Sequence, residues 1–168
     1  PRDVADRPDV RPLGEVRGDV EFRHLTFRYP DGEFDALRDV SFTIRAGQRV
    51  GIVGRTGPGK TTVVDLILRT CNVPDGSLFI DGHDVNTVPI RDVRRAAAYV
   101  PQDNFLFSDT IARNIDFTES VPDRERVSIA ASLADVDNDV KDFPLGYDTV
   151  LGERGVTVSG GQKQRISI

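Results

Sequence analysis

The sequence predicts an α/β fold with a strand-rich N-terminal part and a helical C-terminal part. Three observations lead to this prediction. Apolar and polar residues alternate in two segments within the first fifty positions, as they do in half-buried strands. An apolar run at 50–53 is followed by a glycine-rich turn and then by a helical pattern. After Pro101 the pattern becomes helical and more polar.

The strands can be placed in order along the chain. The alternation that begins after Asp19 shifts once, between Phe22 and Leu25, and a turn at 30–32 follows it. The short apolar stretch after Gly76 is bracketed by Asp-Gly turns. Strands are therefore predicted at 20–27, 39–44, 50–53, 77–80 and 97–100.

The helices follow from apolar spacing and from capping residues. The first begins at Lys60–Thr62 and continues through Leu68. Asp109 and Thr110 can cap a short helix that ends at Ile115. Further helices are predicted at 90–95, 123–133 and 134–143, with a helix start at 159–165.

The stretch Gly54-Arg55-Thr56-Gly57-Pro58-Gly59-Lys60-Thr61-Thr62 has the pattern of a phosphate-binding loop. It stands between a predicted strand and a predicted helix, which is the context that such a loop requires. Its glycines let successive backbone N–H groups point at an anion, and the helix dipole adds positive charge there. Lys60 can contact the outer phosphates, and the Thr61 hydroxyl can bind Mg²⁺. The sequence therefore predicts a P-loop NTPase-type core that binds a nucleoside triphosphate.

Composition sets limits on other functions. The 168 residues suit one domain, and the net charge of −5 argues against a non-specific nucleic-acid binder. The apolar runs are too short to span a bilayer, and no signal-peptide pattern is present. The single cysteine, Cys71, fits a reducing compartment and is interpreted as a small apolar side chain.

The domain organisation is predicted in four parts. Residues 1–18, rich in Pro, Arg and Asp, have no apolar period and are expected to be an extended linker from an absent upstream domain. Residues 19–101 would hold an antiparallel β-subdomain and the phosphate-loop core. Residues 102–158 would form a helical subdomain, and 159–168 the start of a last helix.

Several motifs in order resemble one protein family. Tyr29 precedes the loop, Tyr99-Val100-Pro101-Gln102 follows it, and Gly152-Glu153-Arg154-Gly155 leads into Val158-Ser159-Gly160-Gly161-Gln162. Together they resemble the nucleotide-binding domain of ATP-binding cassette (ABC) transporters. The stretch 106–111 with Asn114-Ile115, and the Gly-Glu-Arg-Gly stretch, are similar to the exporter branch.

The resemblance implies ATP and Mg²⁺ as cofactors and assigns roles to individual residues. Tyr29 would stack on adenine, and Gln102 would contact Mg²⁺ and the attacking water. Ser159, Gly160, Gly161 and Gln162 would form the signature that caps the γ-phosphate of ATP on a partner. The implied partners are a second such domain, identical or different, in a head-to-tail dimer, and transmembrane domains. The implied location is the cytoplasmic face of the cell membrane, with Glu153 and Arg154 near the transmembrane domains.

Two features depart from the family pattern. Pro58 removes a backbone N–H, and the loss of one charge-assisted hydrogen bond, about 1.5–3 kcal/mol, predicts weakened but not abolished ATP binding. The sequence ends at Ile168, and the resemblance places the Mg²⁺-holding aspartate, the catalytic glutamate and a histidine further on. The fold is thus expected to be incomplete at the C-terminus, and these residues alone to be inactive as an ATPase and poorly stable.

Three hypotheses about the function of the parent protein stay open at this point. One is an exporter whose ATPase domain couples ATP binding and hydrolysis to transport. A second is the hydrolysis-poor half of a heterodimeric exporter, which Pro58 suggests. A third is a soluble ABC ATPase without a transport role, against which the Gly-Glu-Arg-Gly stretch and the linker argue.

Overall fold

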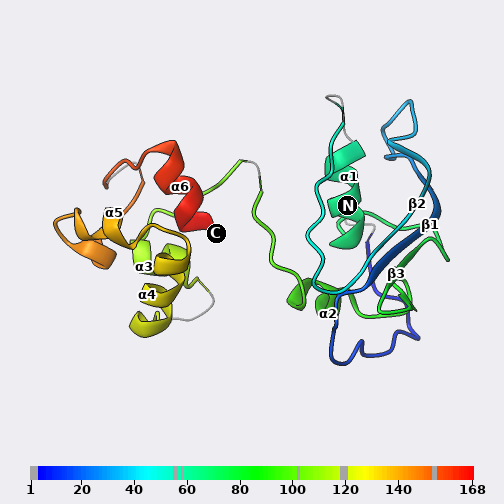
Figure 1. Cartoon of the computed structure of the whole chain (residues 1–168), viewed down its shortest axis with the longest axis horizontal. Helices are drawn as coiled ribbons and strands as arrows, with labels where there is room; N and C mark the ends of the chain where they lie inside the picture. The colour runs from blue at the N-terminus through cyan, green and yellow to red at the C-terminus, as the bar shows by residue number, and fades with distance from the viewer. Residues whose placement is uncertain (1–3, 55–56, 58, 102, 118–120, 153–154) are drawn as a thin grey trace. The chain divides into compact units, whose positions relative to one another are not determined.

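The computed structural model describes the chain apart from residues 1–3, 55–56, 58, 102, 118–120 and 153–154 (Figure 1). The chain forms two compact units, the first of residues 1–98 and the second of residues 99–168. The four-part division made from the sequence is finer than these units and stays a prediction. In the described residues no helix is long and apolar enough to cross a membrane.

Unit 1 is built on an antiparallel sheet. Its strands are β1 (Val20–Phe27), β2 (Leu37–Ile44), β3 (Leu78–Ile80) and β4 (His83–Asp84), in the order β2-β1-β3-β4. Phe22 of β1 pairs with Phe42 of β2 and with Leu78 of β3. The shift in alternation predicted after Phe22 is confirmed as an irregularity in the β1–β2 register.

The backbone at that shift is unusual on both strands. His24 and Asp39 each have positive φ (45° and 49°), a region that non-glycine residues seldom occupy. The backbone N–H of His24 donates to Ser41 Oγ (2.8 Å), and that of Asp39 donates to Thr26 Oγ1 (2.9 Å). Side-chain hydroxyls thus replace ladder bonds and let β1 change which residues face the core.

Two helices complete unit 1. They are α1 (Gly59–Ile67) and α2 (Ile90–Arg95), both where the sequence predicted helices. Leu66 of α1 and Val93 of α2 join Phe22 and Leu78 of the sheet in one buried cluster. Burial of this apolar surface is what fixes α1, and hence the loop before it, on the sheet.

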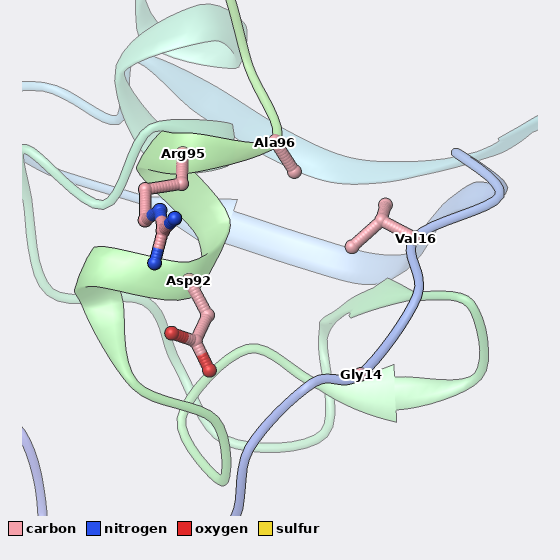
Figure 2. A pocket seen from close by; sticks show the side chains of 5 residues that line it. All are labelled: Gly14, Val16, Asp92, Arg95 and Ala96. Carbon is pink, nitrogen blue, oxygen red and sulfur yellow. The ribbon is translucent and has the colours of Figure 1, made fainter.

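The N-terminal segment, 4–18, packs against the rest of unit 1 without forming helix or strand. Leu13 is 7% exposed and belongs to the core cluster, and its N–H donates to Asp92 Oδ2 (3.2 Å). Figure 2 shows how Gly14 and Val16 pass opposite Asp92 and Arg95 of α2, with a pocket between them. Nearer the N-terminus, Asp6 Oδ1 accepts the N–H of Ile90 (2.8 Å) and the N–H of Arg11 donates to the carbonyl of Thr87 (2.9 Å), so the irregular segment is docked at several points; its role as a linker stays a prediction.

Asp81 holds the end of this segment. Its carboxylate accepts the backbone N–H groups of Arg17 (2.7 Å), Gly18 (3.1 Å) and Asp19 (2.8 Å). Burial alone would raise the pKa of this carboxyl, but the three N–H groups outweigh burial and lower the pKa. The charged form of Asp81 is therefore part of the folded structure.

Unit 2 is helical, as predicted. Its elements are α3 (Ile111–Ile115), α4 (Arg124–Leu133), α5 (Asp137–Lys141), a 3₁₀ turn η1 (Gly146–Asp148) and α6 (Gly160–Ser167). The side chain of Thr110 caps α3, as predicted, and the side chain of Asp123, the first residue of the predicted helix 123–133, caps α4. A second buried cluster joins the helices through Ile111, Ala131, Val136, Val140, Leu151 and Ile166.

Two predicted strands are wrong. Residues 50–53 and 97–100 have no strand structure, and Val53 and Tyr99 are 92% and 50% exposed. The sequence pattern identified apolar runs, but a strand also needs a neighbour to take its backbone hydrogen bonds. In the described part of the chain, the sheet contains only β1 to β4, and these two runs do not join it.

Candidate functional site

The loop predicted to bind phosphate runs into the N-terminus of α1, which begins at Gly59. The first turn of a helix leaves backbone N–H groups without intrahelical partners, so that this end attracts anions. The first four residues of α1, all of which the structure describes, include no acidic side chain that would repel a phosphate. Gly54 and Gly57 are exposed, whereas Arg55, Thr56 and Pro58 lie outside the described residues.

Lys60 lies back over this loop. Its Nζ donates to the carbonyl oxygen of Gly54 at 3.3 Å, so that the ammonium group is held across the turn. A cation in this position can contact the outer phosphates of a nucleotide lying on the loop. The long distance indicates a weak hydrogen bond that a phosphate oxygen can replace.

Gly59 lies where the backbone of another segment comes close to α1. A Cβ atom built there would lie 3.0 Å from the carbonyl oxygen of Ala36 and 3.6 Å from Leu37 Cδ2. The loop between β1 and β2 therefore touches the start of α1. This contact favours a residue without a side chain at position 59, independently of phosphate binding.

Tyr29, the predicted adenine platform, belongs to the same β1–β2 loop. Its Oη is within 3.0 Å of both Thr62 Oγ1 and Asp65 Oδ2 on α1, and its ring meets Phe27 edge to face. Burial is the main reason why the pKa of Tyr29 is raised. Tyr29 is thus tied to the helix that follows the phosphate loop, which sequence spacing alone could not show.

The two threonines after Lys60 differ in exposure. Thr61, predicted to bind Mg²⁺, is exposed, whereas Thr62 is completely buried beside Tyr29. A hydroxyl can hold Mg²⁺ only where the ion can reach it, so Thr61 fits this role. Any contact of Thr62 with a nucleotide would come from its backbone N–H.

Gln102, the other predicted Mg²⁺ ligand and catalytic residue, lies outside the described residues.

In unit 2, the predicted signature residues form a capped helix start. Ser159 is the N-cap of α6, and its Oγ accepts the N–H of Gln162 (3.2 Å). Gln162 Oε1 in turn accepts the N–H of Ser159 (2.9 Å), which completes a capping box. Gly160 and Gly161 are exposed in the first turn. Small exposed residues at a capped helix start are suited to contact with an anion.

The two exporter-like stretches of unit 2 lie side by side. The N–H of Leu151 donates to the carbonyl of Asp109, and that of Ile111 donates to the carbonyl of Thr149, both at 2.9 Å. Gly152 lies so close to Ser108 that a side chain at 152 would overlap it. Glu153 and Arg154, which follow, lie outside the described residues.

Asn114 organises the turn before α3. It is 7% exposed, and its Oδ1 accepts the N–H of Phe107 at 2.7 Å. Its Nδ2 donates to the carbonyl groups of Phe107 (3.1 Å) and Thr110 (2.9 Å). The sequence supplied Asn114 only as part of a resemblance, and its role in satisfying buried backbone groups is a finding of the structure.

Each unit therefore groups its own predicted residues. Unit 1 brings together Tyr29, the glycine loop, Lys60 and Thr61 at one helix start. Unit 2 brings together Ser159, Gly160, Gly161 and Gln162 at another. The donors of unit 1 are N–H groups, an ammonium and an exposed hydroxyl, which is a chemistry that fits phosphates with Mg²⁺.

Sequence reasoning missed Asp81 and Asp139. Their carboxylates accept hydrogen bonds from residues that are far away along the chain, Asp19 and Gln162 respectively.

Comparison with known proteins identifies the family. The family profile described as "ABC transporter" matches residues 37–168. A probable multidrug resistance ABC transporter ATP-binding/permease protein, YheI, of Bacillus subtilis is 42% identical over 99% of this chain and 28% of its own length. An ATP-dependent lipid A-core flippase of Photorhabdus laumondii is 42% identical over 93% of this chain and 27% of its own length.

A solved structure agrees with these relatives. The structure of a bacterial Atm1-family ABC exporter with ATP bound matches 98% of this chain and 29% of its own, with a TM-score of 0.89 and 39% identity. The chain thus spans less than a third of the length of these relatives. It has the P-loop NTPase-type fold of an exporter nucleotide-binding domain. The chain belongs to the ABC transporter family.

Proposed function

We propose that this chain is the ATP-binding domain of an ABC exporter, which couples ATP binding and hydrolysis to export across a membrane. The observation that carries the proposal is the helix start at Gly59, with Lys60 held across the loop at Gly54 and Tyr29 tied to the same helix. The names of the relatives, a multidrug transporter and a lipid A-core flippase, support an export role for the protein that contains this domain.

The residues have separate roles in this proposal. Backbone N–H groups at the start of α1 and Lys60 Nζ bind the phosphates, and the Thr61 hydroxyl holds Mg²⁺. Mg²⁺, when bound, would neutralise charge on the β- and γ-phosphates. The Tyr29 ring stacks on adenine, and Gln102 contacts Mg²⁺ and orients the attacking water.

The partners follow from the second helix start. Ser159, Gly160 and Gly161 at α6 would contact the γ-phosphate of ATP bound to a second nucleotide-binding domain, so two ATP molecules lie between two domains. We also propose transmembrane domains as partners and the cytoplasmic face of the membrane as the location. The names "ATP-binding/permease" and "exporter" among the relatives support both.

Photolabelling tests the nucleotide site directly. MgATP carrying an azide on the adenine ring should label the peptide around Tyr29 when it is irradiated with the 168-residue chain. Tyr29→Phe keeps the ring and should label nearly as well, whereas Tyr29→Ala loses the stacking surface and should label several-fold less. Labelling that is equal in all three would contradict the assignment of Tyr29.

The gene on either side of this chain tests the exporter role. Apolar segments of about 20 residues upstream support an exporter. An aspartate–glutamate pair downstream supports hydrolysis, and its absence would favour the hydrolysis-poor half of a pair. The lack of membrane segments in the gene and its neighbours would overturn the exporter proposal. We further propose that residues 1–168 bind ATP without turnover, and measured Mg²⁺-dependent hydrolysis would contradict this.

A further inference from the structure

One carboxylate holds the start of α6 through two side chains. Gln162 completes the capping box with its Oε1, which accepts the N–H of Ser159 (2.9 Å). Its Nε2 donates to Asp139 Oδ1 of α5 (3.1 Å). Because both ends of the Gln162 amide are engaged, its orientation depends on Asp139. A residue of α5 thus determines how Ser159 is held.

The second oxygen of Asp139 binds Arg165. Arg165 donates to Asp139 Oδ2 at 2.6 Å, a short charge-assisted hydrogen bond, and both side chains are about two-thirds buried. The guanidinium also lies beside the helix start, since a Cβ at Gly161 would be 3.5 Å from its NH1 atom. Asp139 therefore places the positive charge of Arg165 next to the exposed glycines.

The other acidic side chain facing inward on α5 has different partners. Asp137 pairs with Lys141 and accepts from Tyr147 Oη (2.6 Å) of η1. Asp142, at the end of α5, is exposed. Of the three aspartates in this stretch, Asp139 is the one bound to α6.

We propose that Asp139 is a positioning residue for the start of α6, which it aligns through Gln162 and Arg165. This inference rests on the proposed function, in which Ser159–Gly161 contact the γ-phosphate held by a second domain. The capping box orients the backbone N–H groups of the first turn, and Arg165 sets the charge beside them. Asp139 touches neither nucleotide nor Mg²⁺ in this proposal and acts only by fixing the groups that do.

Nuclear magnetic resonance on the 168-residue chain tests the proposal. The variants are Asp139→Asn, which keeps one acceptor for Gln162, and Asp139→Ala, which keeps none. Asp142→Asn is the matched control, because it removes a carboxylate of the same helix that has no role in the network. The two readouts are the pH dependence of the Ser159 amide shift and hydrogen exchange at the Gln162 amide.

In the wild type, the amide chemical shift of Ser159 should change with pH as the Asp139 carboxyl gains or loses its proton. Its midpoint should lie below the ordinary value, because Arg165 and then Gln162 lower the pKa of Asp139. This titration should vanish in both Asp139 variants and persist in Asp142→Asn. Exchange at Gln162 should be about tenfold faster in Asp139→Ala and less so in Asp139→Asn, while Val127 and Ala131 of α4 stay unchanged.

Two results would overturn the proposal. One is an unchanged Ser159 titration and unchanged Gln162 exchange in both Asp139 variants. The other is faster exchange throughout unit 2, including α4, which would give Asp139 only a general packing role. Adding MgATP to the wild type separates this test from the proposed function. Unchanged amide signals of Gly57 and Lys60 on addition of MgATP would contradict ATP binding. The pH titration of the Ser159 amide in the Asp139 variants would still test whether Asp139 aligns α6.

Discussion

Asp81 should decide whether the N-terminal segment stays docked. Asp81→Asn removes the charge but keeps one side-chain oxygen, and asparagine tolerates the positive φ of 49° at this position. The backbone N–H groups of Arg17, Gly18 and Asp19 would then share one neutral acceptor. Charge-assisted hydrogen bonds contribute about 1.5–3 kcal/mol each and do not simply add, so we expect a net loss of about 2 kcal/mol.

This loss corresponds to about a 30-fold higher population of the released segment. Trypsin can cleave after Arg17, and because Asp81 holds the Gly18 N–H, we expect this bond to be cleaved mainly when the segment is released. The initial rate of cleavage at this bond should therefore rise by a similar factor in Asp81→Asn. The matched control is Asp39→Asn, which also has positive φ but whose exposed carboxylate is paired with His24. Equal cleavage of wild type and Asp81→Asn would refute the reasoning.

The same contact predicts a pH dependence. Because the pKa of Asp81 is lowered in the folded chain, its stabilising contribution is complete above the unfolded value of about 3.9. The contribution is lost as the pH falls through the lowered pKa. Protection of the Gly18 amide from hydrogen exchange should decrease over that range in the wild type. In Asp81→Asn the protection should be low at every pH and should not show this step.

Three further substitutions test the local structure. Asn114→Ala leaves buried backbone groups of the turn before α3 unsatisfied and should destabilise unit 2 by about 2–4 kcal/mol in urea unfolding, whereas exposed Asn138→Ala should change little. Gly59→Ala places a Cβ against the β1–β2 loop and should weaken MgATP binding about tenfold in calorimetry, whereas Gly51→Ala meets no neighbour and should leave binding within twofold. Gly152→Ala overlaps Ser108 at a φ of 110° and should destabilise unit 2 by about 2–4 kcal/mol; a stability equal to wild type would contradict the packing described.

Local patterns predicted most of the elements. Alternation placed β1 and β2, the capping residue Thr110 marked the start of α3, and the helical pattern placed the starts of α4 and α6 close to Asp123 and Ser159. These succeed because the periodicity and the caps are properties of neighbouring residues. The glycine–lysine–threonine motif likewise placed the loop at the start of α1.

Long-range contacts could not be predicted in this way. Strands at 50–53 and 97–100 were expected from apolar runs, but strand formation depends on a partner that the runs do not specify. The docking of 4–18 depends on Asp81, more than sixty residues from the groups it binds. The alignment of α6 similarly depends on Asp139 of α5. An aspartate in a polar stretch gives no local sign of such a role.

Calorimetric titration with MgATP tests the central claim most directly. Wild-type chain, Lys60→Ala and the control Lys141→Ala, which removes an exposed lysine paired with Asp137, would be compared. We predict one ATP per chain for wild type and Lys141→Ala, and affinity lower by about 30-fold for Lys60→Ala, since a hydrogen bond between charged groups contributes about 1.5–3 kcal/mol. No binding by the wild type, or equal binding by Lys60→Ala, would contradict the assignment of this loop as the nucleotide site.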